Sequence, residues 1–400
     1  MRIAMVSEHA NPLAAVGGVD AGGQNVHVAA LAGQLVTRGH EVTVYSRRDG
    51  TAAPTQEFAP EGYVVEHVPA GPPSDVPKDG LLQYMPAFAG YLEQRWREEP
   101  ADLVHAHFWM SGVASTRAAR RVQIPVVQTF HALGTVKRRQ QGDHDTSPPE
   151  RIGFERRLCR TVEHVIATCT DEVAELRAMG LPPGRASVIP CGVDTSVFTP
   201  RKMRRGERPR LLFIGRLVER KGIGNLIEAL ASLPGVELVV AGGRSEQGLG
   251  ADPEAARLRV LAAAQGVADR VTFVGGVARA DVPALMCSAD VVVAVPWYEP
   301  FGIVPVEAMS CGRPVVGSSV GGLLDTVVPG VTGELVPPRR PDLLAPVLRD
   351  LLADPARREA YGRAGRRRAV QRYPWTQVSA DTEAVYAALI EPQLTSEVAR

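Results

Sequence analysis

The feature that most constrains this chain is an alternation of short apolar segments with helical ones, which occurs in both halves of the sequence. Arg2–Glu8 is a strand-like segment that leads into a glycine-rich loop, and a helical periodicity from Val26 to Leu35 follows. That periodicity ends at Arg38-Gly39, a basic last turn with a C-cap glycine, and a second strand-like segment begins at Glu41. This β-loop-α-β order predicts the start of a doubly wound parallel sheet.

The alternation continues, stops near the middle of the chain and then starts again. The interruption is the segment 191–200 and the charged segment 201–210, where we place an interdomain linker. Strand-like segments precede it at 102–107, 125–131 and 164–168, and follow it at 210–215, 236–241, 271–274, 291–295 and 314–317, with a helix at 222–233. We therefore expect an α/β protein with two Rossmann-like domains, residues 1–200 and 201–375, that face each other across a cleft. A last helix over 376–400 is expected to cross back onto the first domain.

Composition agrees with a globular protein of two domains. A length of 400 residues suits two cores, and the glycines and prolines lie between periodic segments instead of forming a low-complexity tract. The 45 basic and 44 acidic residues leave a formal charge of +1, which argues against nucleic acid as a partner. With no apolar segment long enough to cross a bilayer and no recognisable signal peptide, we expect a cytoplasmic protein without stable membrane insertion; oligomers are possible. Five widely spaced cysteines favour neither disulfides nor a zinc site.

The segment 296–312 holds the most informative motif. It lies between a strand-like segment and a predicted helix, and it places Glu299 and Glu307 on either side of a Pro-Phe-Gly turn. Two isolated glutamates would be interpreted as surface residues, but carboxylates beside such a turn can accept hydrogen bonds from vicinal hydroxyls of a sugar. The first N–H groups of the helix have no partner within it and can bind hydroxyls or phosphate; they belong to Phe301, Gly302 and Ile303.

Two further glycine-containing turns are expected at the same kind of strand end. Arg216 and Lys221 lie in the turn after the first strand of the second half, where two cations would neutralise a diphosphate. Arg220 between them is predicted to be exposed. Gly22 and Gly23 precede the first helix, where glycine allows close approach of a phosphate to the backbone. Because their spacing does not match G-x-G-x-x-G, a dinucleotide-dependent dehydrogenase is disfavoured.

Histidines and acidic residues in the first half give weaker signals. His131 follows a predicted strand, and His105 with His107 end an earlier strand on one face, where we expect them to line the cleft wall. No third ligand for a metal can be placed beside them. Asp143-His-Asp145 resembles a metal-binding D-x-D, but it lies in a polar loop that we interpret as solvated. The sequence therefore predicts no metal site.

Five ordered features together resemble the retaining glycosyltransferases of family 4, which have the GT-B fold. They are the Gly-Gly loop, His131, the segment 215–222, the E-x7-E pair, and the glycine-containing segments 320–323 and 330–336. The resemblance covers nearly the whole chain. It implies a metal-independent enzyme without a cofactor, in which the first domain binds a small polar acceptor and the second a nucleotide-sugar donor. It also implies front-face attack, with the acceptor deprotonated by the leaving phosphate.

The resemblance also assigns roles to single residues. Arg216 and Lys221 would stabilise the leaving diphosphate, and Glu299 would hold the donor sugar. Glu307 would hold ribose hydroxyls, and His131 would lie beside the donor sugar. The expected donor is a UDP-sugar with a hexosyl or N-acetylhexosaminyl group.

The acceptor is predicted from a comparison within this family. The chain is most similar to the N-acetylglucosaminyltransferases that act on inositol phosphate in mycothiol synthesis, and to enzymes that glycosylate aminocyclitols in aminoglycoside antibiotic biosynthesis. The former bind the acceptor phosphate with lysine, tyrosine, threonine and arginine. Here Lys78 and Arg151 match two positions, whereas Phe108 and Ala132 replace the two hydroxyl residues. This favours an unphosphorylated cyclitol or aminocyclitol such as 2-deoxystreptamine.

Three alternatives stay open at this point. One is the inositol-phosphate N-acetylglucosaminyltransferase activity, and another is a GDP-mannose-dependent mannosyltransferase, for which an exposed apolar or basic amphipathic patch is expected. A third, from a different class, is a nucleotide-sugar-binding protein without catalysis.

Overall fold

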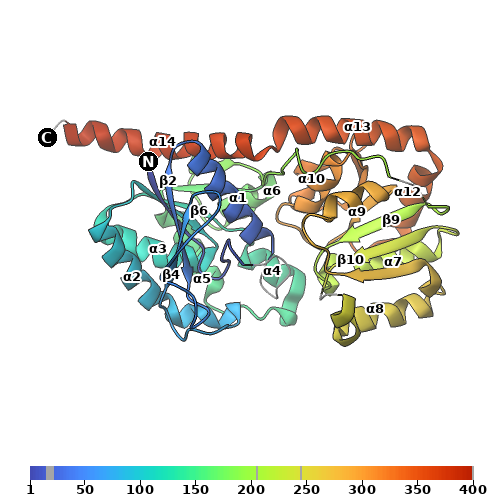
Figure 1. Ribbon diagram of the computed structural model, residues 1–400, viewed down its shortest axis with the longest axis horizontal. Helices are drawn as coiled ribbons and strands as arrows, with labels where there is room; N and C mark the ends of the chain where they lie inside the picture. Colours follow the sequence, from blue (N-terminus) through green and yellow to red (C-terminus); the bar gives the residue numbers. More distant parts are fainter. Residues whose placement is uncertain (15–21, 204–205, 244–245, 399–400) are drawn as a thin grey trace. The chain divides into compact units, whose positions relative to one another are not determined.

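A computed structural model describes residues 1–14, 22–203, 206–243 and 246–398. The chain forms two compact units: unit 1 is Met1–Pro190 together with the residues from Trp375 onward, and unit 2 is Cys191–Pro374. Each unit has a sheet of parallel strands connected by helices (Figure 1), so the predicted class of two Rossmann-like α/β domains is confirmed.

Unit 1 is built on an eight-stranded sheet within its described residues, with the order β3-β4-β2-β1-β5-β6-β7-β8. All neighbouring strands are parallel except β3, which is antiparallel to β4. The strands are β1 (Arg2–Val6), β2 (Glu41–Arg47), β3 (Gln56–Phe58), β4 (Val64–Val68), β5 (Leu103–His107), β6 (Val126–Thr129), β7 (His164–Ala167) and β8 (Ala186–Val188).

The helices of unit 1 connect these strands, and the last one returns from the end of the chain. They are α1 (Gly23–Thr37), α2 (Met85–Glu98), α3 (Trp109–Val122), α4 (Gly134–Gln141), α5 (Arg151–Thr161), α6 (Thr170–Ala178) and α14 (Trp375–Val398). Figure 1 shows α14 beside α1, and the Glu383 carboxylate of α14 accepts hydrogen bonds from Arg38 and His40 just after α1. Trp375 and Tyr386 of α14 are buried in the core of unit 1.

Unit 2 has a fully parallel sheet with the order β11-β10-β9-β12-β13-β14. Its strands are β9 (Arg210–Ile214), β10 (Glu237–Ala241), β11 (Val271–Gly275), β12 (Val291–Ala294), β13 (Val315–Ser318) and β14 (Gly333–Val336). Its helices are α7 (Ile223–Ala231), α8 (Pro253–Ala264), α9 (Val282–Ser288), α10 (Ile303–Ser310), α11 (Leu323–Thr326), α12 (Pro341–Ala353) and α13 (Pro355–Arg372).

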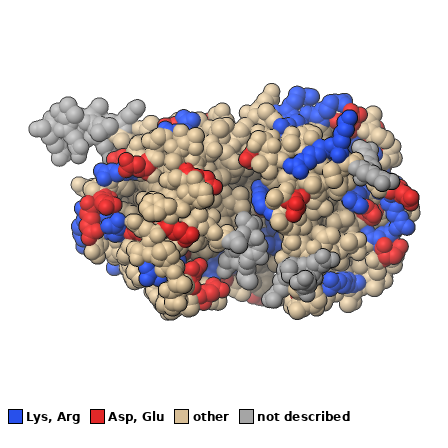
Figure 2. Space-filling model, viewed as in Figure 1, with Lys and Arg blue, Asp and Glu red and all other residues tan. Residues whose placement is uncertain are grey.

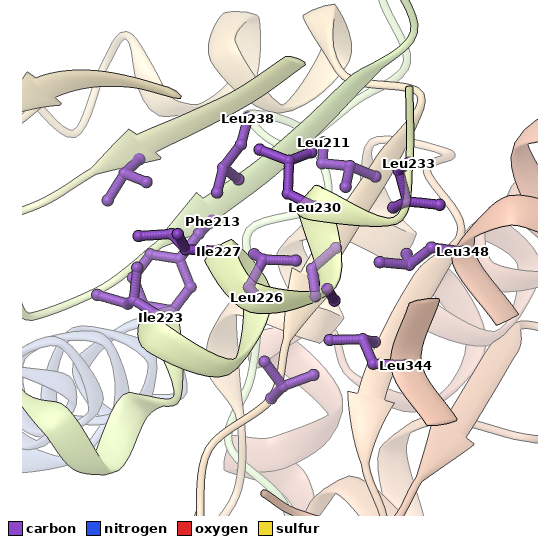
Figure 3. Packing of buried hydrophobic residues seen from close by; sticks show 14 of the residues in the cluster. Leu211, Phe213, Ile223, Leu226, Ile227, Leu230, Leu233, Leu238, Leu344 and Leu348 are labelled. Carbon is purple, nitrogen blue, oxygen red and sulfur yellow. The ribbon is translucent and has the colours of Figure 1, made fainter. Parts of the chain in front are cut away.

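The core of unit 2 explains why α7 follows β9 so closely. Leu226, Ile227 and Leu230 of α7 pack on Leu211 and Leu238 of the sheet, all at most 2% exposed (Figure 3). Their helical spacing gives one continuous apolar face. Burial of such side chains contributes roughly 1.5–3 kcal/mol each relative to exposure. The helix is thereby fixed, and so is the turn that precedes it.

Residues 191–200, which were expected to belong to the first domain and the interdomain linker, belong to unit 2. Unit 1 ends at Pro190, before the expected boundary at residue 200. Val193 and Phe198 are buried in the core of unit 2, and Val193 N–H donates to the carbonyl of Tyr373 at 2.7 Å. The guanidinium of Arg366 also donates to the carbonyl of Phe198 at 2.8 Å. The prolines and polar residues of the segment suggested a linker, but its two apolar side chains attach it to unit 2.

The described surface carries charges of both signs. Figure 2 shows acidic and basic side chains interspersed on the visible face, with a basic group over α13, where Arg363, Arg367 and Arg372 are exposed. Within the described residues, no helix is both long and apolar enough to span a bilayer.

Candidate active site

The turn after β9 and the loop after β12 are joined at the carboxyl edge of the unit 2 sheet. These two strands are neighbours, and Trp297 N–H donates to the carbonyl of Arg220 at 2.8 Å. Gly222 has φ +76°, and a Cβ on it would lie 1.9 Å from the carbonyl oxygen of Val295. Glycine is required for both this backbone conformation and this close approach. The turn therefore depends on Gly222.

Lys221 and Glu299 form an ion pair between these two loops. Their side chains are 20% and 19% exposed, so the pair is accessible from one side only. Burial lowers the pKa of Lys221, and the Glu299 carboxylate opposes that effect. The structure thus brings together two residues that the sequence assigns to the donor, and the Glu299 carboxylate favours the charged form of Lys221.

Arg220 does not lie as the sequence predicted. It was expected to be exposed but is partly buried, whereas Arg216 is exposed. Burial lowers the pKa of Arg220, and the charge of Arg216 lowers it further. The expectation fails because Trp297 binds the backbone of Arg220 and draws it against the loop after β12. The turn after β9 therefore carries three cationic side chains, those of Arg216, Arg220 and Lys221.

The loop before α10 presents unpaired backbone groups. Gly302 is the N-cap of α10 with φ +89°, and Gly322 N–H donates to the carbonyl of Glu299 at 2.9 Å, which fixes the start of the loop. The Phe301 ring is 4% exposed and contacts Tyr373, so its side chain anchors the loop in the core. Within the described residues, the N–H groups of Phe301, Gly302 and Ile303 have no hydrogen-bond acceptor. A helix start of this kind binds anions and hydroxyls.

Glu307 lies on α10 and is almost completely buried. It is 2% exposed and forms an ion pair with Arg279, whose guanidinium lies 4.5 Å from the centre of the Phe198 ring. Burial raises the pKa of Glu307, and Arg279 opposes this. Sequence reasoning missed Arg279. Its position just after β11 at the carboxyl edge of a parallel sheet is the signal that could have identified it.

In unit 1, two strand-to-helix turns hold non-glycine residues in left-handed backbone conformations. Phe108 after β5 has φ +83°, and His131 after β6 has φ +59°. Phe108 N–H donates to the carbonyl of Thr129 at 2.8 Å, which ties the two turns together. Such conformations cost roughly 1–3 kcal/mol each and are concentrated at functional sites.

His105 and His107 are buried, and the expectation that they line a cleft wall is wrong. Both are 0% exposed, because β5 is a central strand that is covered by α14. His107 Nδ1 lies 3.0 Å from His131 Nε2, and His105 lies between the hydroxyls of Tyr386 and Thr129. Burial lowers the pKa of His105 to about 3 and that of His131 well below its usual value. The histidines are therefore neutral near pH 7.

The four residues predicted at the acceptor lie together in unit 1. The Lys78 ammonium and the Arg151 guanidinium lie 5.8 Å and 5.1 Å from the centre of the Phe108 ring, within the range of cation–π contacts. Arg151 also donates to the carbonyl of Ala132 at 2.7 Å and pairs with the buried carboxylate of Glu155 at 2.7 Å. Two cations thus lie near one aromatic ring.

Two other sequence predictions have separate outcomes. The loop with Asp143 and Asp145 was interpreted as solvated, but the Asp145 side chain is 3% exposed and pairs with Lys137 at 2.9 Å. The interpretation is wrong for Asp145, because the side chain turns back to bind its own loop. In the Gly-Gly turn, Gly22 N–H donates to Asn25 Oδ1 at 3.1 Å and α1 begins at Gly23, whereas residues 15–21 lie outside the described part of the chain.

No metal centre is found in the described part of either unit: no group of three or more His, Cys, Asp or Glu side chains there is arranged to hold an ion.

Comparison with known proteins identifies two adjoining family models. The model described as Glycosyltransferase Family 4 matches residues 21–197, and that described as Glycosyl transferases group 1 matches residues 198–368. The two matches together span residues 21–368.

Curated relatives and a solved structure extend over nearly the whole chain. The D-inositol 3-phosphate glycosyltransferase of Kineococcus radiotolerans is 36% identical, with 98% of this chain and 96% of the relative aligned. The enzyme of the same name from Xylanimonas cellulosilytica is 38% identical, with 96% of each chain aligned. The structure of sucrose-phosphate synthase from Thermosynechococcus elongatus superimposes with a TM-score of 0.90 at 31% identity, over 98% of this chain and 100% of that one.

Proposed function

We infer the reaction of this chain from one premise: it belongs to glycosyltransferase family 4, whose members are retaining enzymes with the GT-B fold. The chain is therefore a glycosyltransferase, and the binding protein without catalysis is no longer a competing interpretation. The family leaves the donor, the acceptor and the site residues to be proposed from the geometry of each unit.

For the donor, we propose a UDP-sugar that carries a hexosyl or N-acetylhexosaminyl group. Arg216 and Lys221 would stabilise the charge that develops on the leaving diphosphate, together with the free N–H groups at the start of α10. Glu299 would hold the sugar and Glu307 the ribose. Because these cations and amides already supply positive potential, we propose that the reaction needs neither a metal ion nor a cofactor.

His131, Gly22 and Gly23 are the donor residues that we propose in unit 1. The turn of His131 is fixed by its contact with His107, and Gly22 begins the helix that follows the glycine-rich loop. In this proposal, retention arises by front-face attack, with the acceptor hydroxyl losing its proton to the leaving phosphate.

For the acceptor, we propose a phosphorylated cyclitol of the inositol 3-phosphate type. The observation that carries this is that the Lys78 ammonium and the Arg151 guanidinium both lie close to the centre of the Phe108 ring, at 5.8 Å and 5.1 Å. Two cations near one point favour an anionic ligand and disfavour a protonated aminocyclitol, because like charges repel. The names of the two inositol 3-phosphate glycosyltransferases refer to an acceptor of this class.

A second candidate is an unphosphorylated cyclitol or aminocyclitol such as 2-deoxystreptamine, as in antibiotic biosynthesis. Two specific observations favour it. Phe108 and Ala132 offer no hydroxyl to a phosphate, and Arg151 is already paired with Glu155, so part of its charge is compensated inside the protein.

A transfer assay separates the two candidates. Purified enzyme is incubated in EDTA with UDP-glucose or UDP-N-acetylglucosamine and with inositol 3-phosphate, inositol or 2-deoxystreptamine, and products are identified by mass spectrometry and NMR. The proposal predicts transfer to inositol 3-phosphate with retained anomeric configuration. Transfer to inositol or 2-deoxystreptamine alone would select the second candidate, and transfer only from GDP-mannose would overturn the proposed donor.

A further inference from the structure

Four histidines of unit 1 form a cluster beneath α14. His27, His105 and His107 are at most 3% exposed, and the ring of His131 stacks on that of His107 with 5.2 Å between the centroids. His107 also stacks on His105 at 4.0 Å, and His27 contacts both His131 and Trp375. The mechanism proposed above uses only His131, so the arrangement of the others needs an explanation.

The proton positions on His105 follow from its partners. The Thr129 hydroxyl donates to the carbonyl of Ile166 at 3.0 Å, so its oxygen can only accept from His105 Nε2 at 2.9 Å. His105 therefore carries its proton on Nε2, and its Nδ1 accepts from the Tyr386 hydroxyl at 2.6 Å. Both ring nitrogens of His105 have hydrogen-bond partners, so neither is available to His107.

The position of the proton on His107 follows from the free-energy cost of leaving a buried N–H group without an acceptor. Its Nδ1 faces His131 Nε2 at 3.0 Å, and its Nε2 is buried without a partner in the described residues. If Nε2 carried the proton, a buried N–H would be unpaired, which is rarer in proteins than an unpaired acceptor. The proton therefore belongs on Nδ1, from which His107 donates to His131 Nε2.

We propose that His107 is the positioning residue of His131: it donates to Nε2 and thereby fixes His131 as the tautomer with its proton on Nδ1. This inference rests on the proposed function, in which His131 lies beside the donor sugar. In that tautomer the imidazole offers an N–H group and no free lone pair. His131 is then a hydrogen-bond donor to an oxygen of the donor substrate, and it cannot act as the base that deprotonates the acceptor.

The backbone also fixes the position of His131. His131 has φ +59°, and the turn that carries it is tied through Thr129 to the turn of Phe108. Thr129 is also the residue that accepts from His105. The ring of His131 is thus held by the hydrogen bond with His107 of the neighbouring strand. A side chain that contacts the substrate keeps its orientation only if neighbouring side chains hold it in place.

The tautomer is measured directly by NMR. The full-length wild-type protein is labelled with ¹⁵N-histidine, and long-range ¹H–¹⁵N correlations identify which ring nitrogen carries the proton, with the His131 signals assigned from the His131→Gln variant. The inference predicts a single tautomer of His131 with the proton on Nδ1 at pH 7. A proton on Nε2, or a protonated imidazolium, would overturn it.

Two substitutions of similar volume test the role of His107 in the reaction. His107→Phe removes the hydrogen-bond donor to His131. This substitution should lower kcat about tenfold, a typical loss of activity when a residue that orients a functional histidine is replaced. The KM for the nucleotide-sugar should be nearly unchanged. In the matched control Tyr386→Phe, which loses the bond to His105 but not that to His131, Tm should fall while kcat and the His131 tautomer stay the same. Equal kcat in wild type and a folded His107→Phe variant would contradict the positioning role.

The assay also distinguishes this inference from the proposed function beneath it. If His131→Gln transferred sugar as fast as wild type, His131 would not face the donor, and the proposed function of that residue would fail even with the predicted tautomer. If His107→Phe misfolded, the spectrum of the wild-type protein would still decide the tautomer.

Discussion

At the residue scale, the chemistry of this enzyme depends on side chains whose charges are already partly satisfied before substrates bind. Glu299 pairs with Lys221, Arg279 with Glu307, and Arg151 with Glu155. Buried charges need such partners, because an unpaired ion in a protein interior loses several kcal/mol of solvation. A substrate that binds to one of these side chains must therefore replace part of its ion pair within the protein. We expect single substitutions of these paired residues to change the affinity for substrates.

The first prediction concerns the acceptor. The double variant Phe108→Tyr, Ala132→Thr adds two hydroxyl groups near Lys78 and Arg151. We expect kcat/KM for inositol 3-phosphate to rise at least about tenfold relative to that for inositol, because tenfold corresponds to about 1.4 kcal/mol, close to the lower value of about 1.5 kcal/mol for a single hydrogen bond to a charged group. Steady-state kinetics with both acceptors measure the ratio.

The matched control for this prediction is Phe154→Tyr. Phe154 stacks on Trp109, and neither Lys78 nor Arg151 is among the cations found over its ring. The acceptor ratio should not change in that variant. A double variant with an unchanged or lower preference for the phosphorylated acceptor would show that Phe108 does not contact a phosphate.

The residue scale also shows what the sequence could predict. Lys221 and Glu299 were assigned to one site from a strand end and a turn, and the structure pairs them. Arg279 was missed: its position shortly after the strand predicted at 271–274 marks the sheet edge, but the Glu307 with which it pairs lies on a helix that is distant in the sequence. The burial of His105 and His107 could not be predicted, since it results from α14, whose side chains come from the far end of the chain.

At the element scale, the turns after parallel strands place the candidate site, and their glycines set the geometry. Strands with a continuous apolar run, such as β9, β12 and β13, were predicted to within a residue or two. The strands β3, β4 and β14 were not, because β3 is exposed throughout and β4 and β14 interrupt their apolar residues with charged ones. Their place at or near sheet edges removes the apolar signal of a central strand.

The second prediction tests one of these turns. Gly222→Ala and Gly235→Ala introduce the same methyl group at nearly equal backbone angles, φ +76° and +73°. At Gly235 nothing lies within 4 Å, whereas at Gly222 the methyl would meet the Val295 carbonyl at 1.9 Å. Gly235→Ala should therefore lose only the left-handed penalty of about 1–2 kcal/mol.

Gly222→Ala should lose more, and it should also weaken nucleotide binding because the turn that carries Lys221 must move. Urea unfolding gives the free energies, and calorimetric titration gives the affinity. If the two variants were equally stable and bound nucleotide equally well, the close approach at Gly222 would not determine the site.

At the scale of the whole molecule, each unit has its own core, so the units are expected to respond to conditions separately. Unit 1 contains the cluster of neutral histidines, whereas unit 2 holds its charges in ion pairs.

The third prediction is a loss of stability of unit 1 in mild acid. Burial lowers the pKa of His27 from 6.5 to about 4, so the unfolded chain takes up a proton that the folded chain does not. Unfolding becomes easier as the pH falls below 6.5, and the stabilisation is lost by pH 4. A shift of this size corresponds to roughly 3 kcal/mol.

Thermal unfolding at pH 7 and pH 5 measures this effect. The fall in Tm between the two pH values should be smaller in His27→Phe, which keeps an aromatic ring against Trp375, than in wild type. His144→Phe, on an exposed residue, serves as the control and should behave as wild type. The same fall in all three proteins would show that folding does not lower the pKa of His27.

The most direct test of the central claim is calorimetric titration of UDP into the wild-type enzyme in the presence of EDTA, alongside Lys221→Ala and Glu307→Ala. If unit 2 holds the donor as proposed, wild type binds UDP without metal and more tightly than GDP or ADP, and each substitution weakens binding at least about tenfold, or about 1.4 kcal/mol. Equal affinity of all three proteins for UDP, or no binding to wild type, would contradict the account.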